Sequence, residues 1–254
     1  MTPAVESWIN LTQAEDVITH CRTVTAHSIA FACILLCLVS PRANADSHLL
    51  DEWFRESEHA PRYEDQRDDF RRLLEEARTD GVPPELVMLV LREGAAKRVS
   101  PSRLVAAMEE EEERLATSRT LLEEADLLPI RNADIRDALR ELSVYQVAGV
   151  EPDSISAILG VTESLEVGLH AVSAVAQIVA IQPLSEPTTA ELGRSILKSE
   201  LTPATFGSVS SAYLRGTLAG LPPQSVARII IDVLDAGGGL IQIDRELRAR
   251  GRRR

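Results

Sequence analysis

Three segments of this chain repeat one arrangement of glycine, aliphatic residue and proline, and this repetition constrains the fold strongly. The segments start at Gly81, Gly149 and Gly220, 68 and 71 residues apart. In each, an aliphatic residue follows the glycine, proline stands three positions after it, and further aliphatic residues stand six, nine and ten positions after it. Glycine ends a helix in the left-handed conformation, and proline suits the first turn of the next helix. The pattern therefore predicts antiparallel helical hairpins around a common core, whether the segments are true repeats or one joint reused.

The composition favours the same fold class. Hydrophobic residues make up 44% of the chain and aromatic residues 4%. A core built mainly of Leu, Val, Ile and Ala favours helices over a β-sandwich, which needs more aromatic and β-branched residues. We expect an all-α fold, a bundle or short array of about eight antiparallel helices.

The N-terminal part of the chain has the pattern of a secretory signal peptide. The uninterrupted apolar run Ile29–Val39 is followed by Ala43-Asn44-Ala45, small residues at the two positions that a signal peptidase reads. A transmembrane anchor is the alternative, but a run of this length covers roughly half of a ~30 Å hydrocarbon core. Residues 1–45 are therefore predicted to be a signal peptide and the protein to be exported, either periplasmic or secreted. Acidic residues ahead of the run leave open a true start downstream of Met1.

Export has a consequence for the cysteine chemistry of the mature chain. Cys21, Cys33 and Cys37 are the three cysteines, and all precede the predicted cleavage site. The mature chain then has no disulfide, no cysteine nucleophile and no thiolate metal site.

The mature chain divides by composition into three parts. Residues 46–80 are a charged helical segment that holds most of its aromatic side chains, residues 81–249 form the helical core domain, and residues 250–254 are a basic tail. Within the core domain, Val161–Ile181 is apolar almost all round, which is typical of a buried helix. We expect this segment to be the central helix that the others surround.

A second spacing pattern, which we call the second joint, occurs twice in the sequence, once before its middle and once near its end. Gly94 is followed by four residues, an aliphatic residue, any residue and Pro101, and the same order returns from Gly216 to Pro223. Ser100 is the predicted N-cap and Pro101 the first residue of the following helix. This joint resembles a pattern in uncharacterised exported α-helical bacterial proteins, over roughly Ala77–Leu128. The resemblance implies no activity.

Two groups of charged residues are candidates for an interaction surface. The first, at the Gly94 joint, is Glu93, Lys97 and Arg98. The second is a positive C-terminus formed by Arg245, Arg248, Arg250, Arg252, Arg253 and Arg254. These arginines suit anionic lipid headgroups in a weak membrane-surface contact, a cell-wall polymer, an acidic partner or the chain's own Glu109–Glu113 run. The alternative is a solvated end that adds solubility.

Other polar residues are better explained as structural. The five consecutive glutamates Glu109–Glu113 are predicted to form a solvated helix face. His170 lies in the most apolar segment, so we expect a hydrogen-bonded core histidine, with a functional role as the alternative. His48 and His59 are in the charged N-terminal segment and do not have the spacing of a metal-binding pair.

The sequence favours a non-enzymatic protein. It contains no nucleophile elbow, zinc-protease motif, phosphate-binding loop or dinucleotide-binding glycine pattern. A net charge of −12 argues against nucleic-acid binding. We predict an exported helical scaffold or binding protein that contacts a protein or cell-envelope partner, without cofactor or metal. The alternatives are a carrier with an apolar ligand in a cavity beside Val161–Ile181, and a carboxylate-dependent cell-wall hydrolase, which would need more aromatic residues to hold sugar.

Overall fold

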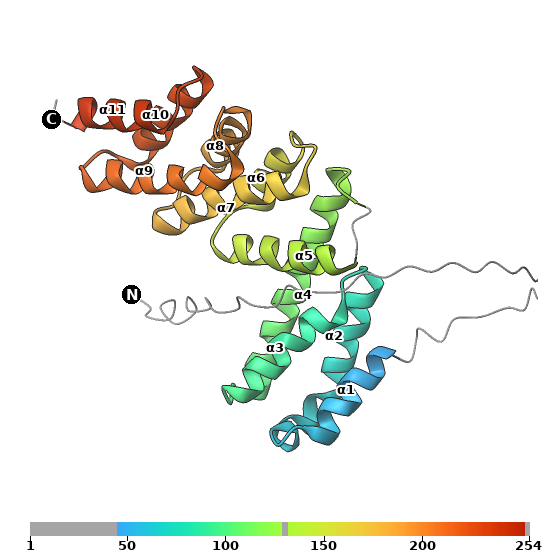
Figure 1. Ribbon diagram of the computed structural model, residues 1–254. Helices are drawn as coiled ribbons and strands as arrows, with labels where there is room; N and C mark the ends of the chain where they lie inside the picture. Colours follow the sequence, from blue (N-terminus) through green and yellow to red (C-terminus); the bar gives the residue numbers. More distant parts are fainter. Residues whose placement is uncertain (1–44, 129–131, 252–254) are drawn as a thin grey trace, which may run out of the picture. The chain divides into compact units, whose positions relative to one another are not determined.

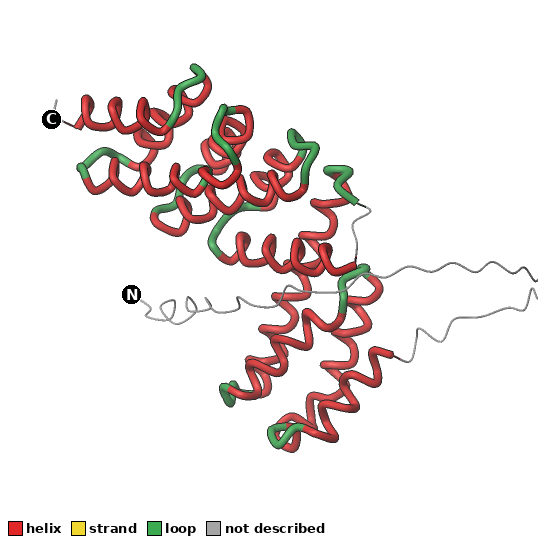
Figure 2. The backbone as a smooth tube through the Cα atoms, viewed as in Figure 1, coloured by secondary structure: helices red, strands yellow, loops and turns green. Residues whose placement is uncertain are grey.

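The computed structural model describes residues 45–128 and 132–251, which belong to one compact unit that spans Pro41–Arg254. These residues form eleven α-helices and two short 3-10 helices, η2 and η3, and contain no strand (Figures 1 and 2). The elements are α1 (Ala45–Glu56), η2 (Ala60–Gln66), α2 (Arg67–Thr79), α3 (Pro84–Ala96), α4 (Pro101–Glu124), α5 (Asn132–Val147), α6 (Pro152–Leu159), α7 (Leu165–Ile181), α8 (Glu186–Lys198), η3 (Pro203–Thr205), α9 (Gly207–Leu218), α10 (Pro223–Asp235) and α11 (Leu240–Gly251). The all-α prediction is confirmed, with more α-helices than the expected eight.

Two predictions fall on residues that the structure does not describe. Residues 1–44, which hold nearly all of the predicted signal peptide, lie outside the described residues, as do Arg252, Arg253 and Arg254. Within the described ranges, no helix combines the length and the apolar composition that crossing a membrane requires.

The helices are arranged in two rows that follow the order of the chain. The even-numbered helices α2, α4, α6, α8 and α10 pack each against the next in that row, and α5, α7, α9 and α11 form the second row in the same way. Neighbours along the chain, such as α3 and α4 or α9 and α10, join the rows. Each helix thus packs mainly against the helices that are one or two places before or after it in the chain. This is the contact pattern of a repeat array. Of the two predicted architectures, the array describes these contacts better than a closed bundle.

The three glycine joints have one geometry. Gly81, Gly149 and Gly220 all take positive φ angles, of 70°, 93° and 83°. At each joint the amide of the next residue donates to a carbonyl five residues earlier, with N···O distances of 2.8, 3.1 and 3.2 Å. This is the Schellman arrangement, and the aliphatic residues that follow the glycines (Val82, Val150 and Leu221) are buried, as that motif requires. Helices then begin at Pro84, Pro152 and Pro223, as predicted.

The glycines of the second joint act differently from the sequence-based expectation. Gly94 lies inside α3 and Gly216 inside α9. A Cβ at Gly94 would lie 2.4 Å from Leu104 Cδ1, and one at Gly216 would lie 2.9 Å from Val226 Cγ1. The absence of a side chain at each glycine therefore lets the next helix approach closely. The near contact in each case is the side chain ten residues later in the sequence, Leu104 or Val226.

The turn after α3 also differs from the prediction in two details. The left-handed residue is Arg98, with φ of 56°, where the later joint has Gly220. Ser100 occupies the N-cap position of α4, but its side chain makes no capping hydrogen bond, so the predicted side-chain cap was wrong. Pro101 is the first residue of α4, as predicted.

The charged N-terminal segment is packed onto the helices that follow it. Trp53, Phe54, Tyr63 and Phe70 form a cluster with ring centroids 5.0–6.5 Å apart. The Tyr63 hydroxyl donates to the Val99 carbonyl at 2.7 Å, which fixes η2 to the turn between α3 and α4. The aromatic residues are therefore part of the hydrophobic core at the α1–α2 end of the array.

The apolar segment predicted as the central helix corresponds to α7, which begins at Leu165 rather than Val161. Ser164 caps it by accepting a bond from the Val167 amide at 3.5 Å. Helix α7 packs against α5, α6, α8 and α9, and eight of its residues are buried. Its apolar character is explained by these neighbours. However, α7 is one member of the second row and has exposed residues, among them Glu166, His170 and Gln177. The prediction of a central helix that the others surround was therefore wrong.

Candidate interaction surface

The last helix of the array has one buried face and one exposed face. After α10, Gly237 turns the chain with φ of 76°, and α11 then packs against α9 and α10. Ile243 and Leu247 are buried in this contact. Among the described helices, α9 and α10 make the main contacts with α11. The exposed residues of α11 include Ile241, Arg245, Arg248 and Ala249.

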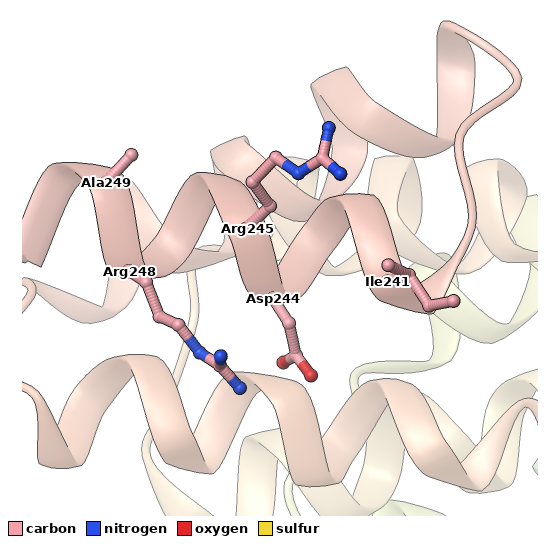
Figure 3. Close-up of a pocket in the computed structure, with 5 residues that line it drawn as sticks. All are labelled: Ile241, Asp244, Arg245, Arg248 and Ala249. Atoms are coloured by element: carbon pink, nitrogen blue, oxygen red, sulfur yellow. The ribbon is translucent and has the colours of Figure 1, made fainter.

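The exposed face borders a depression with a volume of about 560 Å³. Ile241, Asp244, Arg245, Arg248 and Ala249 line it, and we call these five residues the α11 surface (Figure 3). Positions 241, 245, 248 and 249 have the spacing of one helix face. Figure 3 shows Asp244 and Arg248 on one edge of this face and Arg245 and Ala249 on the other. Ile241 is 77% exposed and, with Leu218 at 78%, is one of the two most exposed large hydrophobic side chains of the described residues.

The charges of the α11 surface are unbalanced. Asp244 accepts a charge-assisted bond from Arg215 on α9 at 2.8 Å, so its carboxylate is already neutralised. Arg245 and Arg248 are exposed and make no ion pair with any residue in the described ranges. On the neighbouring helix α9, Leu218 is 78% exposed. The result is a locally cationic face with apolar groups on a chain whose net charge is −12.

The predicted C-terminal residues are only partly brought together. Arg245 and Arg248 belong to the α11 surface, whereas Arg250 lies within α11 and pairs with Glu246 at 3.8 Å. Sequence reasoning missed the contributions of Ile241, Asp244 and Ala249. Their helical spacing relative to Arg245 and Arg248 was the signal that could have identified them.

The residues predicted at the Gly94 joint lie on a different part of the array. Lys97 Nζ is 2.6 Å from Glu93 Oε1, so these two side chains pair with each other at the C-terminal end of α3. Arg98 is exposed in the turn after α3. Helix α3 packs with α1, α2 and α4, whereas α11 packs with α9 and α10. The two predicted groups therefore do not form one site.

The structure contradicts the prediction made for His170. His170 is exposed on α7, so its predicted burial in the core was wrong. His48 and His59 each lie near a glutamate, Glu52 and Glu58, at 3.8 and 3.7 Å. Among the described residues, no group of three or more His, Cys, Asp or Glu side chains is arranged to hold a metal ion.

The glutamate run is not a uniform solvated face. Glu109 pairs with Arg72 of α2 at 2.7 Å, and Glu111 pairs with Arg114 at 2.9 Å. Glu112 is buried between the helices, with only 8% of its surface exposed. The prediction of a solvated face was therefore wrong at Glu112.

Two features of the described residues stand out: the α11 surface, with an exposed aliphatic side chain and two arginines outside any ion pair, and the buried carboxyl group of Glu112. Comparisons with protein-family models, with curated proteins and with solved structures found no match. The function of this chain is therefore inferred from the geometry of its described residues.

Proposed function

We propose that this protein is a non-enzymatic helical scaffold that binds a partner through the α11 surface. The supporting observation is the exposed Ile241 beside Arg245 and Arg248, two cations without an ion-pair partner among the described residues. Charge complementarity points to a partner segment that combines acidic and apolar side chains. Such a segment would cover Ile241 and neutralise both guanidinium groups in one contact.

The array architecture fits this role. A helix in either row gains its stability from helices one or two places away, so the terminal face of α11 is not needed to close a core. An amphipathic helix from a partner could place acidic side chains against Arg245 and Arg248 and an apolar side chain against Ile241. Binding of a helix to a helical face through side chains at i, i+4 and i+7 is a recurring mode of recognition.

The predicted cellular location belongs to the same proposal. The apolar run Ile29–Val39 and the Ala43-Asn44-Ala45 site support export, with a protein or cell-envelope polymer as the partner outside the cytoplasm. Arg252, Arg253 and Arg254 follow α11 in the sequence and add three positive charges to this end of the chain.

The two alternative functions receive less support. The depression at α11 is lined by residues of α11 alone, so it does not supply the cavity beside α7 that an apolar-ligand carrier would need. A hydrolase would need a carboxyl group that reaches its substrate. Glu112 is the buried glutamate of the described residues, but its Oε1 is enclosed between helices and does not line the pocket.

Native mass spectrometry of the full protein purified from its source cells tests the proposal. We expect the protein to retain an acidic protein or peptide, and we expect the double variant Arg245→Glu/Arg248→Glu to lose it, because the charge reversal replaces attraction by repulsion. The matched control is Arg92→Glu/Arg103→Glu, which reverses two other exposed arginines. A retained apolar small molecule, bound equally by all three proteins, would contradict the scaffold and support the carrier.

A further inference from the structure

The carboxyl group of Glu112 is buried without a complete set of hydrogen-bond partners. Its side chain is 8% exposed, and its Oε1 has no hydrogen-bond partner. Glu112 shares a face of α4 with Glu109 and Arg119. Glu109 bonds to Arg72 of α2, and Arg119 bonds to the Gly81 carbonyl after α2. A buried carboxylate is costly unless a cation or several donors stabilise it. No cation is paired with Glu112 in the described structure, so the ionised form of this side chain is disfavoured.

The groups that face Glu112 are themselves acidic. From α2 and the turn that follows it come Glu76 and Asp80, and Asp80 is in hydrogen-bonding contact with Glu112. From α4 itself comes Glu113. Two carboxyl groups hydrogen-bond to each other only when one of them carries a proton, because two carboxylates have no donor between them.

The nearby cations are committed to other partners. Arg72 of α2 bonds to Glu76 and Glu109 at 2.9 and 2.7 Å. Arg119 of α4 donates to the Gly81 carbonyl at 3.0 Å and pairs with Glu123.

The other elements packed against α4 are η2, α3, α5 and α6. The polar contact from α5 goes to Glu111, which accepts a bond from Ser143 at 2.9 Å. The Tyr63 hydroxyl of η2 bonds to Val99. The charged groups that raise the pKa of Glu112 are Asp80 in the turn after α2, Glu76 of α2 and Glu113 of α4. Burial first, and then the neighbouring Asp80 carboxylate, raises the pKa of Glu112 to about 7.

We propose that Glu112 and Asp80 form a proton-binding site at the contact between α2 and α4, and that loss of the proton loosens the packing of α2 on α4. In the protonated state, the Glu112 O–H donates to Asp80 and the pair carries one negative charge. In the deprotonated state, Glu112, Asp80 and Glu76 are three carboxylates at one contact, and the bond between the first two is lost. Water must then enter the contact or α2 must move away, so α2 responds to pH across the neutral range. This proposal does not depend on the α11 surface.

Amide hydrogen exchange of the full protein at pH 6 and pH 8 tests the proposal. After correction for the intrinsic pH dependence of exchange, we expect protection around Ala77 on α2 and Glu112 on α4 to fall about tenfold relative to α7–α10. The factor follows from a group that titrates near 7 when packed and near 4.5 when exposed. Glu112→Gln should remove the pH response, because its amide donates to Asp80 at either pH.

Two further variants keep the result interpretable. Asp80→Asn changes an exposed residue, removes the nearest charge and should reduce the pH response even if Glu112→Gln fails to fold. Glu124→Gln, on the exposed side of α4, should leave the response as in the unaltered protein. Equal protection at both pH values in the unaltered protein, or a response that persists in both Glu112→Gln and Asp80→Asn, would overturn the proposal.

Discussion

Gly193→Ala is expected to lower the free energy of unfolding by about 2 kcal/mol. A Cβ at this position of α8 would lie 2.3 and 2.4 Å from Cδ1 and Cγ1 of Ile158 on α6, and 3.4 Å from Val175 Cγ2 on α7. Ile158 is fully buried and stiff at its branched Cβ, so it has little room to move aside. Overpacking of a filled core costs about 1–3 kcal/mol, and the better helix propensity of alanine offsets part of that cost.

Gly207→Ala is the matched control, measured by urea denaturation beside Gly193→Ala. Gly207 begins α9, is exposed, and a Cβ there would have only the Gln177 side-chain oxygen at 4.0 Å among its near neighbours. We expect it to leave the unfolding midpoint unchanged or raised slightly. If Gly193→Ala were as stable as Gly207→Ala, the close contact of α8 with α6 would be contradicted.

The second large effect is a loss of stability as the pH rises from 5 to 8. Glu112 has an ordinary pKa of 4.5 in the unfolded chain, and the fold raises this pKa to about 7. Between these values the folded protein holds a proton that the unfolded chain has lost, so stability falls with rising pH in this window and levels off above it. One pKa unit corresponds to about 1.4 kcal/mol, which sets an upper limit of about 3 kcal/mol. Because Asp80 and Glu76 are exposed and screened by solvent, we expect a contribution of about 2 kcal/mol.

Glu112→Gln isolates this contribution in a comparison of denaturation curves at pH 5 and pH 8. The variant should be close to the unaltered protein at pH 5 and more stable than it by about 2 kcal/mol at pH 8, because glutamine has no charge to bury. Other titrating groups affect both proteins alike and cancel in the difference. A difference that does not change with pH would show that Glu112 keeps an ordinary pKa.

The helices were predictable from the sequence wherever local chemistry sets their ends. The glycine, the buried aliphatic residue and the proline of each main joint satisfy the backbone of one helix end and start the next, so they fix the joint without tertiary information. The close-approach role of Gly94 and Gly216 was not predictable, because it depends on which side chain the next helix brings to that point. The two-row order likewise depends on packing between helices that are not adjacent in the chain.

The exposure of His170 was predictable in principle. The mean apolar character of α7 suggested burial on all sides, but Glu166, His170 and Gln177 recur at helical spacing and are all exposed. They form a polar stripe within an otherwise buried helix. The exposure of a residue is therefore predicted better from its own polarity and its position on the helix than from the average composition of the helix.

Glu112 is the reverse case, because the average composition of the glutamate run predicted exposure and this one position is buried. The five consecutive glutamates predicted a solvated helix face. In a helix, however, consecutive side chains point in different directions, so one of the five can face the core. Leu104, Met108 and Leu115 are buried, and Glu112 falls on their stripe at i+8, i+4 and i−3. Burial between helices, and then Asp80, raises the pKa of Glu112; both depend on tertiary packing and could be found only in the structure.

Photo-cross-linking from position 241 in the source cells tests docking at the α11 surface most sharply. A photoreactive residue in place of Ile241 should give one discrete adduct, which disappears when Arg245→Glu/Arg248→Glu is added. The same residue in place of Leu89, which is 45% exposed on α3, should not give that adduct. The absence of any adduct at position 241, or the same adduct at both positions regardless of the arginines, would contradict docking at the α11 surface.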